Sequence, residues 1–268
     1  MASDEQDLQL DKPNPARVYD YLIGGKLNYA IDREFAHRIL KLVPFSAEIC
    51  LLNRRWLRRV VRFGVEQGIR QFVDVGSGMP TEGHVHEVAQ GIAPECRVVY
   101  VDNEPIAVAH SEIVLEGNDR AAMIMADGTR ADEVMTHPET QAMLDLDLPV
   151  MVIMAAFLHF TSPEGERDEA VELLARYADH VPSGSYFAIS LATDELSDPR
   201  YLESTAMYKD TSRPFYLRSR AQVRALTDAY ELVEPGVVFT PEWRPDRAGD
   251  VLPDPSKAFL LTAVVRKP

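Results

Sequence analysis

The sequence predicts an α/β fold: an open, mostly parallel sheet of seven strands with one antiparallel edge strand and helices on both faces. Three observations predict it. Short apolar runs alternate with helical patterns from residue 71 to 191, which is the order of strand–helix–strand units. The run 148–156 is continuously apolar, as is typical of a central parallel strand. The last two strands, near 232–239 and 258–266, have no helix between them, so antiparallel pairing is expected.

The first predicted strand and the turn after it organise the rest of the chain. Residues 71–83 read Gln-Phe-Val-Asp-Val-Gly-Ser-Gly-Met-Pro-Thr-Glu-Gly. The apolar residues predict a buried strand, Gly76 and Gly78 permit a tight turn beside a ligand, and Thr81 is the expected N-cap of the next helix. Such a turn directs backbone N–H groups toward one point, where a polar small molecule can bind. An ordinary strand–helix turn without a ligand is the alternative.

Acidic residues accompany three predicted strands. Asp74 lies in the first strand, Asp102 ends the second and Asp127 follows the third. Because ligands of such sheets bind beyond the carboxyl ends of the strands, where the strand order reverses, these carboxylates are expected to meet Gly76 in one crevice. A carboxylate in the position of Asp102 can accept two hydrogen bonds from ribose hydroxyls. A turn-forming aspartate is the alternative for each.

Composition limits the class of protein. With 268 residues and 46% hydrophobic content the chain is long enough for one large domain with a sizeable core. It has no apolar run near 18 residues and begins with acidic residues, so a cytoplasmic protein without membrane contact is expected. Cys50 and Cys96 have no metal-type spacing and are expected to be buried thiols.

A net charge of −14 disfavours nucleic acid as a partner. One local exception is a predicted helix over 46–67, whose polar side carries Arg54, Arg55, Arg58, Arg59 and Arg62. A solvated helix face is the more common explanation of such a charge run.

Three parts of the chain are expected: a disordered tail over 1–14, a helical lid or extension over 15–69 and a ligand-binding domain over 70–268. The extension is dense in aromatic residues, so it predicts either a lid that excludes water or simple packing on the core. Residues 193–218 are irregular and aromatic and predict a second cap.

Several segments resemble known methyltransferases. Asp74-Val-Gly-Ser-Gly, Tyr100-Val-Asp and Ala126-Asp-Gly resemble class I enzymes that use S-adenosylmethionine (SAM), over roughly residues 70–266. Pro15-Ala-Arg-Val-Tyr-Asp-Tyr-Leu-Ile-Gly-Gly-Lys, Asn53-Arg-Arg-Trp-Leu-Arg-Arg and Gly76-Ser-Gly-Met-Pro-Thr are similar to an actinobacterial S-adenosyl methyltransferase family first catalogued as a domain of unknown function. The resemblance implies a Rossmann-like fold, SAM as methyl donor and S-adenosylhomocysteine as product, but no particular acceptor.

The resemblance also implies the residues that bind the cofactor. Asp74 would contact its amino group, Asp102 its ribose and Asp127 its adenine amino group. The full set assigned to the cofactor is Asp74, Gly76, Ser77, Gly78, Asp102, Asn103, Asp127, Gly128, Ala155, Arg17 and Tyr21.

A small-molecule acceptor is expected beside the cofactor. The residues assigned to it are Tyr19, Tyr29, His159, Tyr201 and Tyr216. His159 follows the central strand and is the one candidate for a general base; a core or substrate-orienting histidine is the alternative. Methyl transfer from a sulfonium needs no metal. His84 and His86, two residues apart, would point in different directions on a helix, so no metal site is expected there.

The predicted function is methyl transfer from SAM to an unidentified small molecule. The first alternative is a SAM-binding regulatory protein without turnover, or one that acts through a partner recognised by the arginine-rich helix. The second is a nicotinamide-dependent reductase. It ranks last because Thr81, preceded by Pro80, stands where the dinucleotide fingerprint has glycine or alanine. The oligomeric state and the type of acceptor atom are left open.

Overall fold

The structure is a computed structural model that describes residues 11–81, 83–195 and 198–268. Its helices are α1 (Pro15–Leu22), α2 (Ala30–Leu42), α3 (Ser46–Glu66), α4 (Val85–Ile92), α5 (Pro105–Leu115), α6 (Ala131–Met135), α7 (Pro138–Met143), α8 (Glu169–Asp179), α9 (Arg200–Ala206) and α10 (Arg220–Ala225). The 3-10 helices are η1 (Leu158–Phe160), η2 (Met207–Asp210), η3 (Thr240–Glu242), η4 (Ala248–Asp250) and η5 (Pro255–Ala258).

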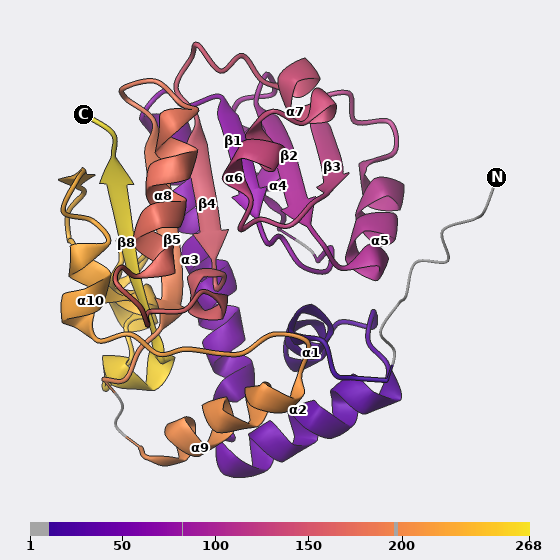
Figure 1. Ribbon diagram of the computed structural model, residues 1–268, viewed down its shortest axis with the longest axis vertical. Coiled ribbons are helices and arrows are strands. Elements are labelled where there is room, and N and C mark those ends of the chain that lie inside the picture. The colour runs from indigo at the N-terminus through magenta and orange to yellow at the C-terminus, as the bar shows by residue number, and fades with distance from the viewer. Residues whose placement is uncertain (1–10, 82, 196–197) are drawn as a thin grey trace.

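The strands form one mixed sheet around which the helices pack (Figure 1). They are β1 (Gln71–Val75), β2 (Arg97–Asp102), β3 (Ala121–Met125), β4 (Met151–Ala155), β5 (Tyr186–Ala192), β6 (Glu231–Leu232), β7 (Val238–Phe239) and β8 (Leu260–Arg266). The order is β3-β2-β1-β4-β5-β8-β6, with β7 also on β8. Strands β1 to β5 pair in parallel and β8 pairs antiparallel to β5. The predicted α/β class is therefore confirmed, and the strand order reverses between β1 and β4.

The far end of the sheet differs in detail from the prediction. One strand was expected near 232–239, whereas the structure has the two short strands β6 and β7, both antiparallel to β8. Pro235 has no N–H to donate, and Gly236 adopts a φ of 88°. The chain therefore turns at these two residues, between β6 and β7, and does not continue as one strand. The described part of the chain thus has eight strands where seven were predicted.

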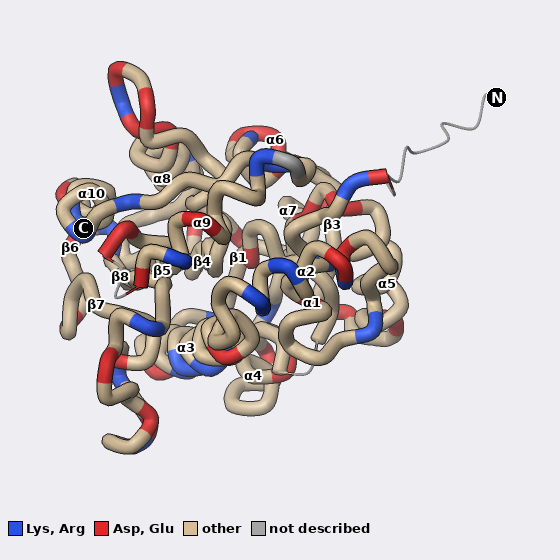
Figure 2. Tube along the Cα trace, turned by 90° about the horizontal axis from the view of Figure 1, so that it is seen from below, with Lys and Arg blue, Asp and Glu red and all other residues tan. Residues whose placement is uncertain are grey.

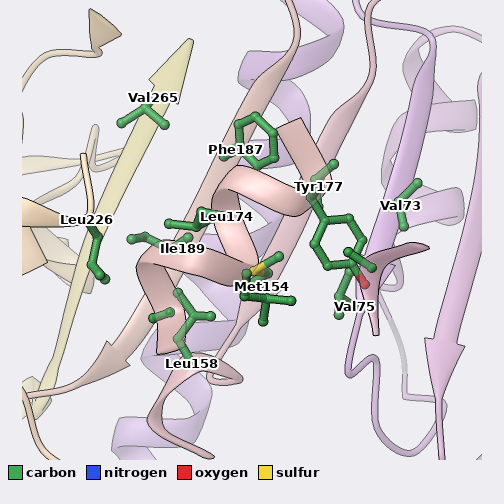
Figure 3. Packing of buried hydrophobic residues seen from close by; sticks show 14 of the residues in the cluster. Val73, Val75, Met154, Leu158, Leu174, Tyr177, Phe187, Ile189, Leu226 and Val265 are labelled. Atoms are coloured by element: carbon green, nitrogen blue, oxygen red, sulfur yellow. The ribbon is translucent and has the colours of Figure 1, made fainter. Parts of the chain in front are cut away.

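The alternation of side chains along β1 places two hydrophobic clusters on opposite faces of the sheet. Val73 and Val75 face the cluster that includes α8, and Phe72 faces the cluster that includes α3 and α4. Figure 3 shows Leu174 and Tyr177 of α8 in the first of these clusters. Both faces of β1 are buried, and its two polar residues, Gln71 and Asp74, are buried as well.

A helical cap lies beyond the carboxyl ends of the parallel strands. Figure 1 shows α1, α2 and α9 together at the end of the sheet toward which the arrowheads of β1 to β4 point. Val18, Phe35 and Ile39 form a small cluster of their own between α1 and α2, with Tyr208 packed against it. The region 193–218, predicted as an irregular cap, contains α9 and η2.

Two helices begin later than the sequence predicts. Thr81 was the expected N-cap of α4, but the helix starts at Val85, because Glu87 accepts a hydrogen bond from the backbone N of His84 at 3.0 Å. Ser162 and Pro163 predict the N-cap and the first residue of the next helix, but this helix, α8, starts at Glu169. Its N-cap is Asp168, whose carboxylate accepts from the backbone N of Ala170 at 2.8 Å.

The predicted tail over 1–14 falls mainly on residues outside the described chain. Its last residue, Asn14, is the N-cap of α1, and its side chain accepts from the backbone N of Ala16 at 2.8 Å. The Asn14 amide also donates to Glu104 at 2.9 Å. The helical extension is therefore tied to the sheet domain from Asn14 onward.

Basic residues gather along α3, as Figure 2 shows, but they do not form one solvated face. Arg59 is buried and donates to the carbonyl oxygens of Trp243 and Thr240, at 2.9 and 2.7 Å. Arg55 and Arg62 form exposed ion pairs with carboxylates. Much of this basic character is thus used within the protein. Among the described helices, none combines the length and apolar character needed to cross a membrane.

Candidate functional site

A cavity of about 220 Å³ lies where the strand order reverses, between the carboxyl ends of the strands and the helical cap. The residues of the predicted site that line it are Tyr19, Asp74, Gly76, Ser77, Gly78, Asp102, Asn103, Asp127, Gly128, Ala155, His159 and Tyr201. The residues that form its wall come from segments spread along the chain between Asn14 and Leu260. The structure therefore brings the three predicted carboxylates into one cavity.

Four residues assigned to the site from the sequence lie outside the cavity wall: Arg17, Tyr21, Tyr29 and Tyr216. Arg17 is buried behind the wall, where it donates to Asp32 at 2.9 Å and to Glu104 at 2.8 Å. Tyr29 is 42% exposed, and the Arg17 guanidinium lies 5.5 Å from the centre of its ring. Arg17 thus joins α1, α2 and the loop after β2. From the sequence it was assigned to the cofactor, and this structural role was not predicted.

The other two tyrosines also have contacts that explain their positions. The hydroxyl of Tyr21 shares a hydrogen bond with His37 Nε2 at 2.7 Å, on the outer side of the cap. The backbone N of Tyr216 donates to the carbonyl oxygen of His159 at 2.8 Å. Tyr216 therefore contacts His159 through its main chain, and a main-chain contact of this kind cannot be predicted from the type of side chain.

Asp102 is held firmly at the end of β2. Its Oδ2 accepts from the backbone N of Gly78 at 2.8 Å, and its Oδ1 accepts from the backbone N of Glu104 at 2.9 Å. Burial raises the pKa of Asp102, and these backbone N–H groups oppose that rise. Each carboxylate oxygen can accept a second hydrogen bond, so the group can also serve two hydroxyls of a ligand.

Asp74 is the most perturbed carboxylate of the site. In the sheet it pairs with Tyr100 on one side and Ile153 on the other, at 3% exposure. Burial raises its pKa to about 7, with Asp102 adding to the rise and Arg54 opposing it. At neutral pH this carboxyl group is therefore poised to ionise when a cation binds beside it.

The raised pKa of Asp74 makes the stability of the protein depend on pH. An unfolded aspartate titrates near pH 4, so between about pH 4 and 7 the native state holds a proton that the unfolded state has lost. The contribution of Asp74 to the free energy of unfolding therefore falls as the pH rises from about 4 to 7 and is constant above that. We expect Asp74→Asn to raise the thermal midpoint at pH 8 and to leave it unchanged at pH 4. An equal difference at both pH values would contradict this assignment.

The two glycines of the turn have different roles. Both adopt left-handed backbone conformations, with φ of 69° at Gly76 and 68° at Gly78. A Cβ atom on Gly76 would lie 2.3 Å from the ring of Phe157, whereas one on Gly78 would meet nothing within 4 Å. Gly76 is therefore needed for the packing of Phe157. Gly78 leaves the backbone open toward the cavity. Between them, the buried hydroxyl of Ser77 has no hydrogen-bond partner in the described structure.

Asp127 connects the strand edge to the cap. Its Oδ1 accepts from both the backbone N and the hydroxyl of Thr129, at 3.0 and 2.8 Å. Its Oδ2 pairs with Arg213 at 3.2 Å. Burial opposes ionisation, but the bonds from Thr129 and Arg213 hold the pKa of Asp127 below its usual value. Asp127 therefore stays charged and ties the segment after η2 to the end of β3.

His159 lies in η1, and a buried network holds its backbone. Arg218 donates to the carbonyl oxygens of Leu158 and Thr161, at 2.8 and 3.0 Å, and forms an ion pair with Asp168 at 2.7 Å. Burial, together with the positive charge of Arg218, lowers the pKa of His159 to about 3. The imidazole is therefore neutral at physiological pH, and it is better suited to accept a hydrogen bond than to take up a full proton.

The cavity carries more negative than positive charge. The carboxylates that line it are Asp20, Asp74, Asp102, Glu104 and Asp127, and the guanidinium groups among the described lining residues are Arg54 and Arg213. This balance favours a ligand with positive charge and disfavours a ligand with a pyrophosphate.

Several residues of the cavity wall were not predicted from the sequence. Arg54 was grouped with the other arginines of α3, although its place in the first half of that helix brings it to the cavity. Glu104 is two residues after Asp102, so it could have been predicted as part of the site. Phe157 and Arg213 gave no signal, because their importance depends on contacts with residues far away in the sequence.

The fold and the carboxylate-lined cavity are those of a class I methyltransferase. The chain belongs to the S-adenosyl methyltransferase family, whose model matches residues 1–268.

Solved structures agree with this assignment. A candidate methyltransferase from Thermobifida fusca is 32% identical, with a TM-score of 0.90 over 100% of this chain and 99% of that one. A DUF574 family protein from Streptomyces avermitilis is 36% identical, with a TM-score of 0.91 over 97% of this chain and 100% of that one. The SAM-dependent methyltransferase SibL, 17% identical, shares the fold with a TM-score of 0.52 over 97% of this chain and 67% of that one. No curated protein matched the sequence.

Proposed function

We propose that the protein transfers a methyl group from SAM to a small-molecule acceptor inside this cavity. The observation that carries the proposal is the joint position of Asp74, Gly78 and Asp102. The backbone N of Gly78 and the carboxylate of Asp102 are hydrogen-bonded, and Asp74 lines the same cavity. In this arrangement the carboxylate of Asp74 can bind an ammonium group, and that of Asp102 can bind a pair of hydroxyls. The pairing of strands β1 and β2 sets the distance between the two carboxylates.

The remaining parts of the cofactor have matching groups in the wall. Asp127 would accept from the adenine amino group through an oxygen that now pairs with Arg213. The hydroxyl of Ser77, buried without a partner in the described structure, would bond a polar group of the methionine part. The main chain at Ala155 would border the same part.

The chemistry asks little of the protein beyond alignment. When bound, SAM supplies an electrophilic methyl group on a sulfonium. The chain's own residues hold the acceptor in line with that methyl group, and the cap excludes water from the cavity. His159 lines the cavity and stays neutral, so it would orient the acceptor through a hydrogen bond without carrying a charge of its own.

The pH dependence of SAM binding tests the proposal. The ammonium group of SAM binds the ionised form of Asp74, whose pKa is raised to about 7 by burial. The affinity is therefore expected to fall about tenfold between pH 7.5 and pH 6, where Asp74 takes up a proton. Asp74→Asn should bind SAM weakly at both pH values, without this dependence. Calorimetric titration measures both, and an equal pH dependence in the variant would contradict the role of Asp74.

Methyl transfer itself requires a separate experiment. Incubation of the protein with methyl-labelled SAM and a cell extract should place the label in a small-molecule fraction. Tight SAM binding without transfer to any fraction would favour a SAM-binding regulatory protein, and label in protein or RNA would contradict the small-molecule acceptor.

A further inference from the structure

The wall of the cavity is divided chemically. The carboxylates Asp74, Asp102 and Asp127 lie at the strand ends, whereas another part of the wall is made largely of rings. We refer to this part as the aromatic compartment; it consists of His159, Phe160, Tyr201, Tyr208, Phe215 and Phe259. The compartment adjoins the proposed SAM site and is the natural place for the acceptor.

The rings of the aromatic compartment form a connected surface. Phe215 stacks on His159, with ring centres 4.2 Å apart and planes inclined by 24°. It also contacts Tyr208 at 4.8 Å and lies nearly parallel to Phe259 at 6.3 Å. Phe160 meets His159 edge-on at 4.4 Å. Faces and edges arranged in this way favour a flat, aromatic ligand over a compact aliphatic one.

Hydroxyl groups around the compartment are already used as donors to the backbone. Tyr201 donates to the carbonyl oxygen of Lys257 at 3.2 Å, and Ser204 donates to the carbonyl of Tyr201 at 2.8 Å. Tyr19 donates to the carbonyl of Cys50 at 2.8 Å. The hydrogen atoms of these hydroxyl groups are therefore already used within the protein and are not available to a ligand.

One polar atom of the compartment differs from these. His159 Nδ1 is buried and has no hydrogen-bond partner in the described structure, and the residue is only 4% exposed. A buried polar atom without a partner destabilises the structure that holds it, so a ligand that donates to it gains affinity. The bonds of Tyr216 and Arg218 to the backbone at and beside His159 keep the ring in place.

The charges of the wall restrict the ligand further. The cationic side chains among the described lining residues are Arg54, which acts on Asp74, and Arg213, which pairs with Asp127. Both are engaged on the carboxylate side. The cap contributes Asp20, whose carboxylate accepts from the backbone N of Leu27 at 2.8 Å. An anionic acceptor would find no free countercharge here and would meet like charges.

Building on the proposed function, we propose that the acceptor is an uncharged, flat aromatic molecule with a hydroxyl group. Its ring lies in the aromatic compartment, and its hydroxyl donates to His159 Nδ1. This arrangement requires the tautomer of His159 that carries its proton on Nε2.

Three probes of similar size test this class: 2-naphthol, 2-methylnaphthalene and 2-naphthoate. Their affinities are measured by calorimetry on the full chain, with and without saturating S-adenosylhomocysteine. We expect 2-naphthol to bind about tenfold more tightly than 2-methylnaphthalene, because only the hydroxyl can donate to His159. We expect 2-naphthoate to bind at least about tenfold more weakly than 2-naphthol, because its charge is unpaired.

A variant identifies the atom responsible. His159→Phe retains a ring against Phe215 but removes the nitrogen, so it should lower the affinity for 2-naphthol about tenfold and leave that for 2-methylnaphthalene unchanged. His110→Phe, the same change on α5 away from the cavity, should leave all three affinities unchanged. Equal binding of 2-naphthol and 2-naphthoate by the wild type, or unchanged binding of 2-naphthol by His159→Phe, would overturn the proposal.

The two proposals fail in different ways. Binding of 2-naphthol without any binding of SAM or S-adenosylhomocysteine would reject the proposed function and leave the aromatic site standing. SAM binding and methyl transfer with no preference for 2-naphthol would reject only the phenol-type acceptor. The probe series on the wild type decides the second question even if His159→Phe does not fold.

Discussion

Replacing Arg17 with methionine is expected to lower the free energy of unfolding by about 3–5 kcal/mol, the usual cost of removing one partner from a buried ion pair. The Arg17 and Asp32 side chains are completely buried and that of Glu104 is 6% exposed. Without the guanidinium, two carboxylates remain close together and away from water. Urea unfolding monitored by circular dichroism measures the change.

Arg55→Met is the matched control, because it removes the same group from an ion pair at the surface. The Arg55 side chain is 54% exposed and its partner Glu48 is 34% exposed. Such a pair contributes at most about 1 kcal/mol. Similar losses in the two variants would show that the position of Arg17 behind the cavity wall has no special energetic weight.

Asp102→Ala is expected to weaken SAM binding at least about thirtyfold, which corresponds to the loss of charge-assisted hydrogen bonds to two hydroxyls. The substitution also removes the acceptor for the backbone N of Gly78. The turn would therefore lose one of its hydrogen bonds to β2, and the bonds of Gly76 and Ser77 to the carbonyl oxygen of Val101 would remain. Calorimetric titration with SAM at pH 7.5 measures the effect.

Asp119→Ala serves as the control for charge, because it removes an exposed carboxylate before β3, outside the cavity wall. It should bind SAM like the wild type. Both variants are first compared with the wild type by thermal unfolding, so that a loss of binding is not mistaken for a loss of fold. Unaltered affinity in folded Asp102→Ala would remove the ribose role assigned to this residue.

The parts of the structure that depend on local pattern could be predicted from the sequence. The apolar runs of β1 to β5 and the helices between them follow from periodicity, and the clustering of Asp74, Asp102 and Asp127 follows from the geometry of parallel strands. The start of α4 could not be predicted, because His84 is an unusual N-cap and Thr81 a common one.

The parts that depend on distant contacts could not be predicted. Arg213 meets Asp127 across 86 positions of the chain, and no local pattern marks either as the partner of the other. Phe215 belongs to the aromatic compartment only because the cap returns over the strand ends. Arg17 lay in a segment that resembles a family motif, yet its burial between two carboxylates became visible only when α2 and the loop after β2 were placed beside it.

The wall of the cavity spans almost the entire chain, from Asn14 to Leu260. During synthesis on the ribosome, the acidic strand ends are made long before Phe259 and Leu260 emerge to complete the enclosure. Until then the wall of the cavity is incomplete. Since a ligand stabilises only the state that binds it, a ligand that needs the complete cavity would protect the finished protein from proteolysis but not its incomplete precursors.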